Sequence, residues 1–271
     1  MAAAGLAGAG TLDHNGAVEI RIPCAAAWRF AAILPLALAE LVGFGAIAGQ
    51  TIAVDVGHSR ALPGATSAHG RMEHEFNLDL ARDVDAALRE RGHATRLIGA
   101  DGSMANLSAR STAARGADLL LSIHHDSVQP HFLEAWVWQD EVRLFSDRYA
   151  GFSLFVSRRN RATAASLRCA SAIGASLRAA GFRPSLYHAD RIPGESKPFA
   201  DRANGVHYYD NLVVLKTAAS PAVLFEAGVI VNRDEAQALA QSDTRERIAA
   251  AVAAGTANCL AARASPARAG K

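Results

Sequence analysis

Four side chains with the chemistry of a hydrolytic metal site stand at the ends of apolar runs or at the start of a helical pattern. His58 follows the run TIAVDVG, His124 ends DLLLSIH, Glu226 ends AVLFE, and Glu73 lies just before an amphipathic segment. A hydrolytic zinc ion takes about three nitrogen or oxygen ligands, leaves one position for water and works with a further carboxylate. The pattern favours His58, Glu73 and His124 as ligands and Glu226 as the base.

Each of these residues also has an ordinary structural interpretation. A histidine at a strand end commonly makes a core or capping hydrogen bond, and a glutamate before a helix stabilises the helix N-terminus electrostatically. Glu226 alone is typical of a strand-end acid. Two neighbours, His125 and Glu75, offer the same ligand chemistry as His124 and Glu73. The joint spacing of the four residues, rather than any one of them, favours the metal site.

Short apolar runs alternate with amphipathic segments along most of the chain, and they predict the elements that position these side chains. The expected strands are Thr51–Val56, Ala94–Ile98, Asp118–His124, Ala135–Gln139, Phe152–Ser157, Leu212–Lys216 and Ala222–Glu226, and the expected helices are Phe76–Arg91, Leu107–Arg115, Ala164–Ala180 and Thr244–Ala262. Continuous apolar strands separated by helices predict one α/β domain whose mostly parallel or mixed sheet carries helices on both faces. Ligands gather at the carboxyl ends of such strands.

Four sequence blocks lie in order along the chain. They are Val54–His58 (VDVGH), Glu73–Asn77 (EHEFN), Ser122–Asp126 (SIHHD) and Val223–Asn232 (VLFEAGVIVN). The blocks resemble the signatures of the zinc-dependent N-acetylmuramoyl-L-alanine amidases of the amidase-3 type, over roughly residues 51–262. The resemblance implies a sheet of about six strands flanked by helices.

The resemblance also implies a role for each of the four residues. His58, Glu73 and His124 would bind one zinc ion per chain, and Glu226 would be the catalytic carboxylate. The implied reaction is hydrolysis of the amide between N-acetylmuramic acid and L-alanine in peptidoglycan, which releases the stem peptide. Glu226 would take the proton of the attacking water and deliver it to the leaving nitrogen. The substrate-binding residues stay unknown.

The family motif also decides between neighbouring residues. His124 is preferred to His125, because successive strand residues point to opposite faces and only one of the two can face the metal. The Glu-x-x-x-Asn spacing to Asn77 favours Glu73 over Glu75. The chain departs from the family pattern where an Ala-Asn or Ala-Asp pair commonly follows the second histidine, since His125 stands there.

Two other functions compete with the amidase on the same fold. A non-catalytic peptidoglycan-binding or regulatory protein would lack a ligand or the carboxylate, and all four residues are present. A zinc peptidase that cuts within the stem peptides would share the fold and the metal, so only its products distinguish it. The sequence contains no HExxH motif, which is typical of another class of zinc protease.

Composition places the chain among globular proteins with a sizeable core. It has 271 residues, of which 50% are hydrophobic and 20% charged, and 28 Lys and Arg face 26 Asp and Glu. Nucleic-acid binding is not expected, because it needs a concentrated basic face and the charges are interspersed.

The first 48 residues differ in character from the rest. An apolar run, Phe30–Ala48, follows Arg29 and ends in a small-x-small pattern. This layout predicts a secretory signal peptide or non-structural leader over residues 1–48, with an N-terminal membrane anchor and a buried helix as the alternatives. Residues 49–263 would then form the catalytic domain and 264–271 a flexible tail. The expected location is the periplasm or cell envelope.

Cysteines, partners and the long insert complete the expectations. Cys169 and Cys259 fall on apolar faces of expected helices, which favours unpaired thiols. The stretches Val128–Tyr149 and Ser185–Asn211 exceed what the fold requires. They would line a substrate groove or cover the site, or they would be ordinary surface loop and an extra edge strand. Some relatives carry an inhibitory helix whose acidic residue occupies the zinc until an activator protein releases it. No strongly helical acidic segment is evident here, so a constitutively active monomer is expected, with an activator protein as the alternative.

Overall fold

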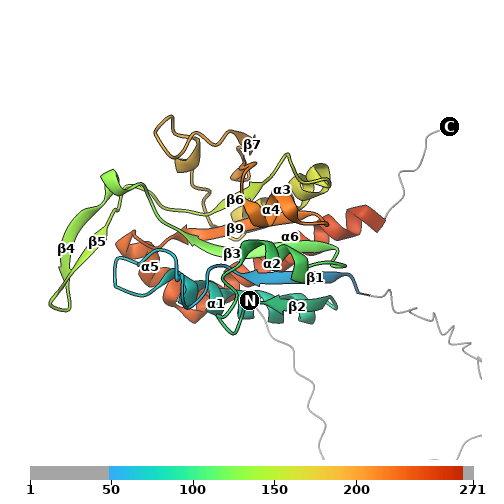
Figure 1. Cartoon of the computed structure of the whole chain (residues 1–271), viewed down its shortest axis with the longest axis horizontal. Coiled ribbons are helices and arrows are strands. Elements are labelled where there is room, and N and C mark those ends of the chain that lie inside the picture. The colour runs from blue at the N-terminus through green and yellow to red at the C-terminus, as the bar shows by residue number, and fades with distance from the viewer. Residues whose placement is uncertain (1–48, 265–271) are drawn as a thin grey trace, which may run out of the picture. The chain divides into compact units, whose positions relative to one another are not determined.

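A seven-stranded mixed sheet forms the centre of the computed structural model, which describes residues 49–264 (Figure 1). The strands are β1 Thr51–Val56, β2 Ala94–Ile98, β3 Leu119–Asp126, β6 Ser153–Val156, β7 Phe199–Asp201, β8 Val206–Tyr208 and β9 Ala222–Val229. Their order is β2-β1-β3-β9-β6-β8-β7, with β2, β1, β3 and β9 parallel and β6 antiparallel to β9. The α/β architecture predicted from the alternation of strands and helices is confirmed.

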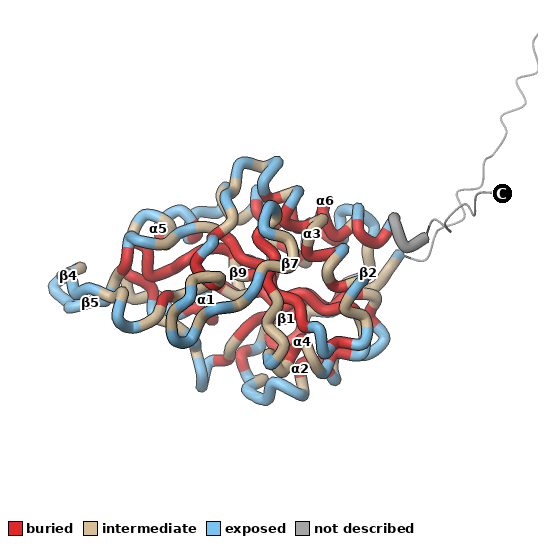
Figure 2. The backbone as a smooth tube through the Cα atoms, turned by 90° about the horizontal axis from the view of Figure 1, so that it is seen from above, coloured by how far each residue is buried: buried red, intermediate tan, exposed pale blue. Residues whose placement is uncertain are grey.

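Six α-helices accompany the sheet among the described residues. They are α1 Glu73–Glu90, α2 Leu107–Ala113, α3 Thr163–Ala179, α4 Val213–Thr217, α5 Arg233–Ala240 and α6 Ser242–Ala264. Along β1, the residues Ile52, Val54 and Val56 pack with α1, α3 and α6, whereas Ala53 packs on the other face with α4. This period of two follows from the pleat of a strand. Figure 2 shows the buried backbone concentrated in the central strands.

A separate two-stranded hairpin projects from the body beside α5 (Figure 1). It consists of β4 Glu134–Trp138 and β5 Glu141–Phe145 and follows the short 3₁₀ helix η1, Pro130–Phe132. One side of the hairpin stacks Trp136 on Trp138, with ring centroids 5.3 Å apart, and Trp136 donates its indole N–H to the carbonyl of Ala68. The sequence predicted β4 but not its partner strand.

The predicted strand Leu212–Lys216 is wrong, since these residues form most of helix α4. Val214, Leu215 and Ala218 are buried against the sheet, a spacing that fits a helix turn rather than strand alternation. A mostly apolar run of five residues is too short for its periodicity to distinguish a helix from a strand. The strands β7 and β8 lie at the edge of the sheet, in the 185–211 insert. An extra edge strand was one interpretation of the two long stretches, but the positions of these strands were not predicted.

The predicted leader, its alternatives and almost all of the predicted tail lie outside the described residues, 49–264. Among those described, no helix combines the length and apolarity needed to cross a membrane.

The expectation of unpaired cysteines is wrong, because Cys169 of α3 and Cys259 of α6 form a disulfide. The two helices pack directly against each other, and the Cα atoms of the two residues are 4.9 Å apart. Each cysteine alone resembles a small apolar residue, so the sequence pattern gave no sign of the pairing.

We expect this disulfide to contribute substantially to stability, since it closes a loop with a sequence separation of 90. A Cys169→Ala, Cys259→Ala variant should lose about 2–5 kcal/mol of unfolding free energy, measured by urea titration. Reductant should destabilise the parent protein and leave the variant unchanged. Alkylation of both cysteines in unfolded, unreduced protein would contradict the pairing.

Candidate metal centre

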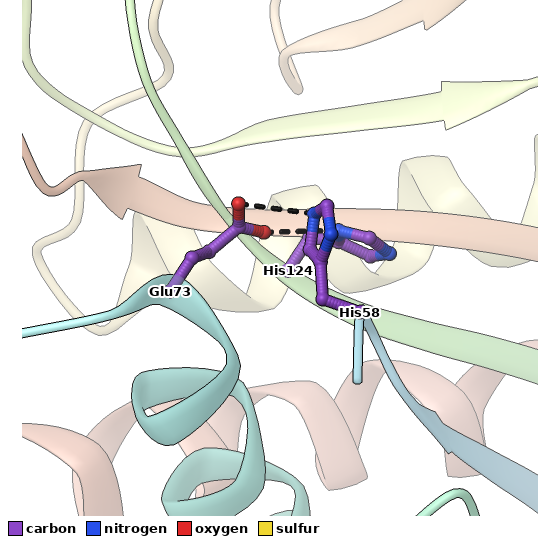
Figure 3. A group of neighbouring side chains, drawn as sticks. All are labelled: His58, Glu73 and His124. Carbon is purple, nitrogen blue, oxygen red and sulfur yellow. Dashed lines mark hydrogen bonds and ion pairs between the residues drawn. The ribbon is translucent and has the colours of Figure 1, made fainter. Parts of the chain in front are cut away.

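Three side chains from three different elements meet at the carboxyl ends of the parallel strands (Figure 3). His58 follows β1, Glu73 begins α1 and His124 lies near the end of β3. The His58 Nε2 is 3.0 Å from one carboxylate oxygen of Glu73, and the His124 Nδ1 is 3.1 Å from the other. The three prospective ligand atoms all lie within 4.8 Å of one another. The structure therefore brings together the three residues that the sequence proposed as ligands.

The backbone around His58 is held in an unusual conformation. His58 has a φ of 66°, in the left-handed region that side chains other than glycine rarely adopt. Arg110 is buried and donates hydrogen bonds to the carbonyls of His58 and Val56. It also forms an ion pair with Asp55 at 2.7 Å. Backbone strain of this kind persists only where surrounding contacts enforce it. Arg110 supplies such contacts.

Gly57 makes room for the second histidine. A Cβ atom at this position would lie 2.4 Å from His124 Nε2, so any larger residue would push the imidazole away. The carbonyl of Gly57 accepts a hydrogen bond of 3.2 Å from Asn77. The absence of a side chain at Gly57 thus lets the His124 imidazole lie directly against the backbone that follows β1.

Glu73 is buried and held as a carboxylate. Burial alone would raise the pKa of Glu73, but the hydrogen bonds and charges of His124 and His58 outweigh burial and hold this pKa well below its usual range. Asn77, one helical turn later, donates a further hydrogen bond of 3.2 Å to Glu73. An ionised carboxylate beside two imidazoles is a suitable donor set for zinc.

The two rival residues occupy other places. His125 is buried on the opposite side of β3, where its Nδ1 lies 2.8 Å from Asn77 Oδ1 and its ring lies against Phe76. Glu75 is exposed and accepts a hydrogen bond from the backbone N–H of Met72, which caps α1. In the structure, Glu73 contacts the imidazole of His124, whereas Glu75 caps the N-terminus of α1.

Glu226 stands beside His124 on the neighbouring strand. The two residues are paired in the β3–β9 register, so their side chains share one face of the sheet. The Glu226 side chain has one oxygen, Oε2, that is buried and accepts no hydrogen bond within the described chain. Burial, together with the charges of Asp126 and Glu73, raises the pKa of Glu226 well above its ordinary value. A carboxyl group with a raised pKa holds a proton more readily than an ordinary glutamate does.

The sequence did not predict a buried chain of ion pairs next to this site. Asp126 Oδ2 lies 2.6 Å from His188 Nε2, His188 Nδ1 lies 2.8 Å from Glu195 Oε2, and Lys197 Nζ lies 2.5 Å from the same oxygen. His188 belongs to the 3₁₀ helix η2, Tyr187–Ala189, in the insert. The only signal in the sequence was the density of charged residues between positions 188 and 197. We call these four residues the ion chain.

The ion chain makes stability depend on pH. Burial lowers the pKa of His188, but Asp126 and Glu195 outweigh burial and raise it from 6.5 to about 9. The resulting stabilisation is complete below pH 6.5 and is lost as the pH rises towards 9. We expect the unfolding free energy to fall by at most about 3 kcal/mol across this window, by urea titration at several pH values. A His188→Gln variant should lack this part of the slope, and an equal slope in both proteins would contradict the assignment.

Two imidazoles and a carboxylate face one point, with a second carboxylate alongside, and this is the set of groups that a single-metal hydrolase site uses. Its place at the carboxyl ends of parallel strands is where an α/β sheet binds ligands.

Comparison with known proteins identifies the family. Residues 52–258 match the model of the Amidase_3 family, N-acetylmuramoyl-L-alanine amidase, and the chain belongs to this family. It is 29% identical over 217 residues to the N-acetylmuramoyl-L-alanine amidases AmiA of Salmonella typhimurium and Escherichia coli, which covers 76% of this chain and 74% of each relative.

Solved structures show the same fold. Ami1 of Mycobacterium smegmatis superimposes with a TM-score of 0.63 at 22% identity, and an amidase of Clostridium difficile 630 with a TM-score of 0.62 at 19% identity. Each comparison covers 80% of this chain and 99% of the solved chain.

Proposed function

We propose that this peptidoglycan amidase binds one zinc ion through His58, Glu73 and His124 and transfers the proton of the reaction through Glu226. The reaction follows from family membership: the enzyme hydrolyses the amide between N-acetylmuramic acid and L-alanine. The observation that carries the zinc assignment is the convergence of three ligand atoms within 4.8 Å from three separate elements.

The chemistry of the donor set fits zinc, which prefers nitrogen and oxygen ligands and keeps a position open for catalysis. When bound, zinc would polarise the scissile carbonyl and lower the pKa of water. The protein residues supply the remaining steps. Glu226 accepts the proton of water at its unpaired Oε2 and returns a proton to the leaving nitrogen, a role that its raised pKa suits. Asn77 and Gly57 keep Glu73 and His124 in place.

The test is digestion of purified peptidoglycan, with the products identified by mass. We expect intact stem peptides that begin with L-alanine, loss of their release after chelation, and recovery with one equivalent of Zn²⁺. Cleavage within the stem peptides would instead support the zinc peptidase. Binding without any cleavage would support the non-catalytic wall-binding protein.

We also propose that the protein is exported to the periplasm or cell envelope and that residues 1–48 are removed. The substrate polymer lies outside the cytoplasm, and a disulfide within the catalytic domain suits an oxidising compartment. Sequencing the N-terminus of the protein recovered from the periplasmic fraction tests this proposal. A mature chain that begins near Gly49 is the expected result.

Activation by a partner is a separate question. A fold neighbour, CwlD from Clostridioides difficile, was solved in complex with the GerS lipoprotein. We propose that the present enzyme acts as a monomer without an activator, because the His58 side chain is 32% exposed and approachable. Purified monomeric protein that digests peptidoglycan unaided would support this proposal, and a strict need for a second protein would contradict it.

A further inference from the structure

The insert places a closed loop, residues 188–197, against the end of β3. The backbone N–H of Lys197 donates to the carbonyl of His188 at 2.7 Å, which closes the loop, and that of Ser196 donates to Asp190 at 2.9 Å. Gly194 has a φ of +88°, and a Cβ there would lie 2.5 Å from Gln129 Nε2. The loop is therefore seated directly on the residues that follow β3.

The ion chain runs through the inside of this loop. Negative and positive groups alternate in the order Asp126, His188, Glu195 and Lys197. Their side chains are between 5% and 11% exposed. Gln129 donates a further hydrogen bond of 2.7 Å to Glu195. Because a buried charge without a partner is costly, each member depends on its neighbours.

His188 is the member that joins the loop to the catalytic strands. Both of its ring nitrogens are engaged by carboxylates, one on β3 and one in the loop. The rings of Phe155 and His207 pack around it, with centroids at 4.8 Å and 5.8 Å. Loss of this imidazole would leave Asp126 without its charge partner and would detach the loop at that point.

The consequence concerns Glu226, which lies on β9 between residues that meet the ion chain. Leu224, two residues earlier, is paired with Phe155, whose ring packs on His188. Asp126 is paired with Val229 in the β3–β9 register, three residues after Glu226. An uncompensated Asp126 would therefore disturb the surroundings of an oxygen that has no partner of its own.

We propose that His188 is a positioning residue for the amidase reaction: it neutralises Asp126 and anchors the 188–197 loop to β3, so that Glu226 keeps the environment in which it transfers the proton. The proposal rests on the proposed function, because it takes Glu226 as the proton-transferring group. His188 acts through Asp126 and does not touch the zinc ligands.

The first test compares His188→Gln with the parent protein, both loaded with zinc. We expect kcat for stem-peptide release from solubilised peptidoglycan to fall by about 10–100-fold, the range seen when a side chain that supports a site residue is removed. KM and zinc affinity should stay unchanged. Arg191→Gln is the matched control, because it removes a cation from the exposed tip of the same loop. A kcat of His188→Gln within about twofold of the parent would overturn the proposal.

A double-mutant cycle separates charge compensation from a general structural effect. If His188 acts by neutralising Asp126, the double variant Asp126→Asn, His188→Gln should be at least as active as the less active of the two single variants. Losses that multiply would mean that the residues act independently, and would overturn the proposal. Thermal unfolding of all four proteins monitors the fold.

Should His188→Gln fail to fold, Glu195→Gln provides the second variant. It keeps the shape of the side chain and removes one charge next to His188, so kcat should fall with zinc affinity unchanged. Parent-like kcat in this variant would then overturn the proposal. Inactive parent protein with zinc bound is a different result, since it would refute the proposed function itself.

Discussion

Replacement of Glu226 by Gln should lower the rate of stem-peptide release by about 10²–10⁴-fold, the usual contribution of a group that transfers the proton. The amide has nearly the same shape but cannot accept the proton of water. Since Glu226 has one buried oxygen without a partner, the exchange removes no hydrogen bond formed by that oxygen within the described residues. Product release is measured by mass spectrometry on purified peptidoglycan.

The matched control for Glu226→Gln is Glu246→Gln, which neutralises an exposed carboxylate on α6. We expect parent activity from the control and one bound zinc ion in both variants. The thermal unfolding midpoint of Glu226→Gln should equal or exceed that of the parent, because a buried carboxyl group that resists ionisation is replaced by a neutral amide. Retention of more than about a tenth of the parent rate would refute the catalytic role.

Replacement of Arg110 by Met should destabilise the protein by about 3–5 kcal/mol, because it leaves the buried carboxylate of Asp55 without its cation. Among the residues that the structure describes, Ser122 would remain as the side chain that donates to Asp55, at 2.6 Å. The carbonyls of Val56 and His58 would also lose their donors, so zinc affinity should fall together with stability. Urea unfolding and competition with a chromophoric chelator measure the two effects.

Arg115→Met is the control for Arg110→Met, since Arg115 is an exposed arginine just beyond the same helix. Its unfolding free energy should stay within about 0.5 kcal/mol of the parent. A loss below about 1 kcal/mol for Arg110→Met would show that the ion pair is not needed to hold the backbone at His58.

The sequence predicted the sheet that positions the site because apolar runs such as Leu119–Ile123 alternate with amphipathic helical segments. It failed at Leu212–Lys216, a mostly apolar run of the same length that forms most of a helix, and it did not locate the strands β7 and β8, which lie in polar sequence. Periodicity does not report such elements, since tertiary contacts rather than a local pattern fix their conformation.

The prospective ligands could be predicted from the sequence because each of them stands at the end of a strand or at the start of a helix. The ion chain was not, because His188 and Asp126 are separated by 62 positions and meet only through the folding of the insert. Arg110 was missed for a similar reason: its partner Asp55 is 55 residues away, and an arginine within a short helix gives no sign of burial.

The disulfide between α3 and α6 links the stability of the domain to the export that we propose. Thiols are kept reduced in the cytoplasm and oxidise after export. A newly made chain would therefore lack the covalent tie between α3 and α6. It would hold α6 by apolar packing and by polar contacts such as the ion pair between Arg245 and Asp83. The enzyme would reach its full resistance to unfolding only on the side of the membrane where the cell wall lies, which separates the time of synthesis from the time of action.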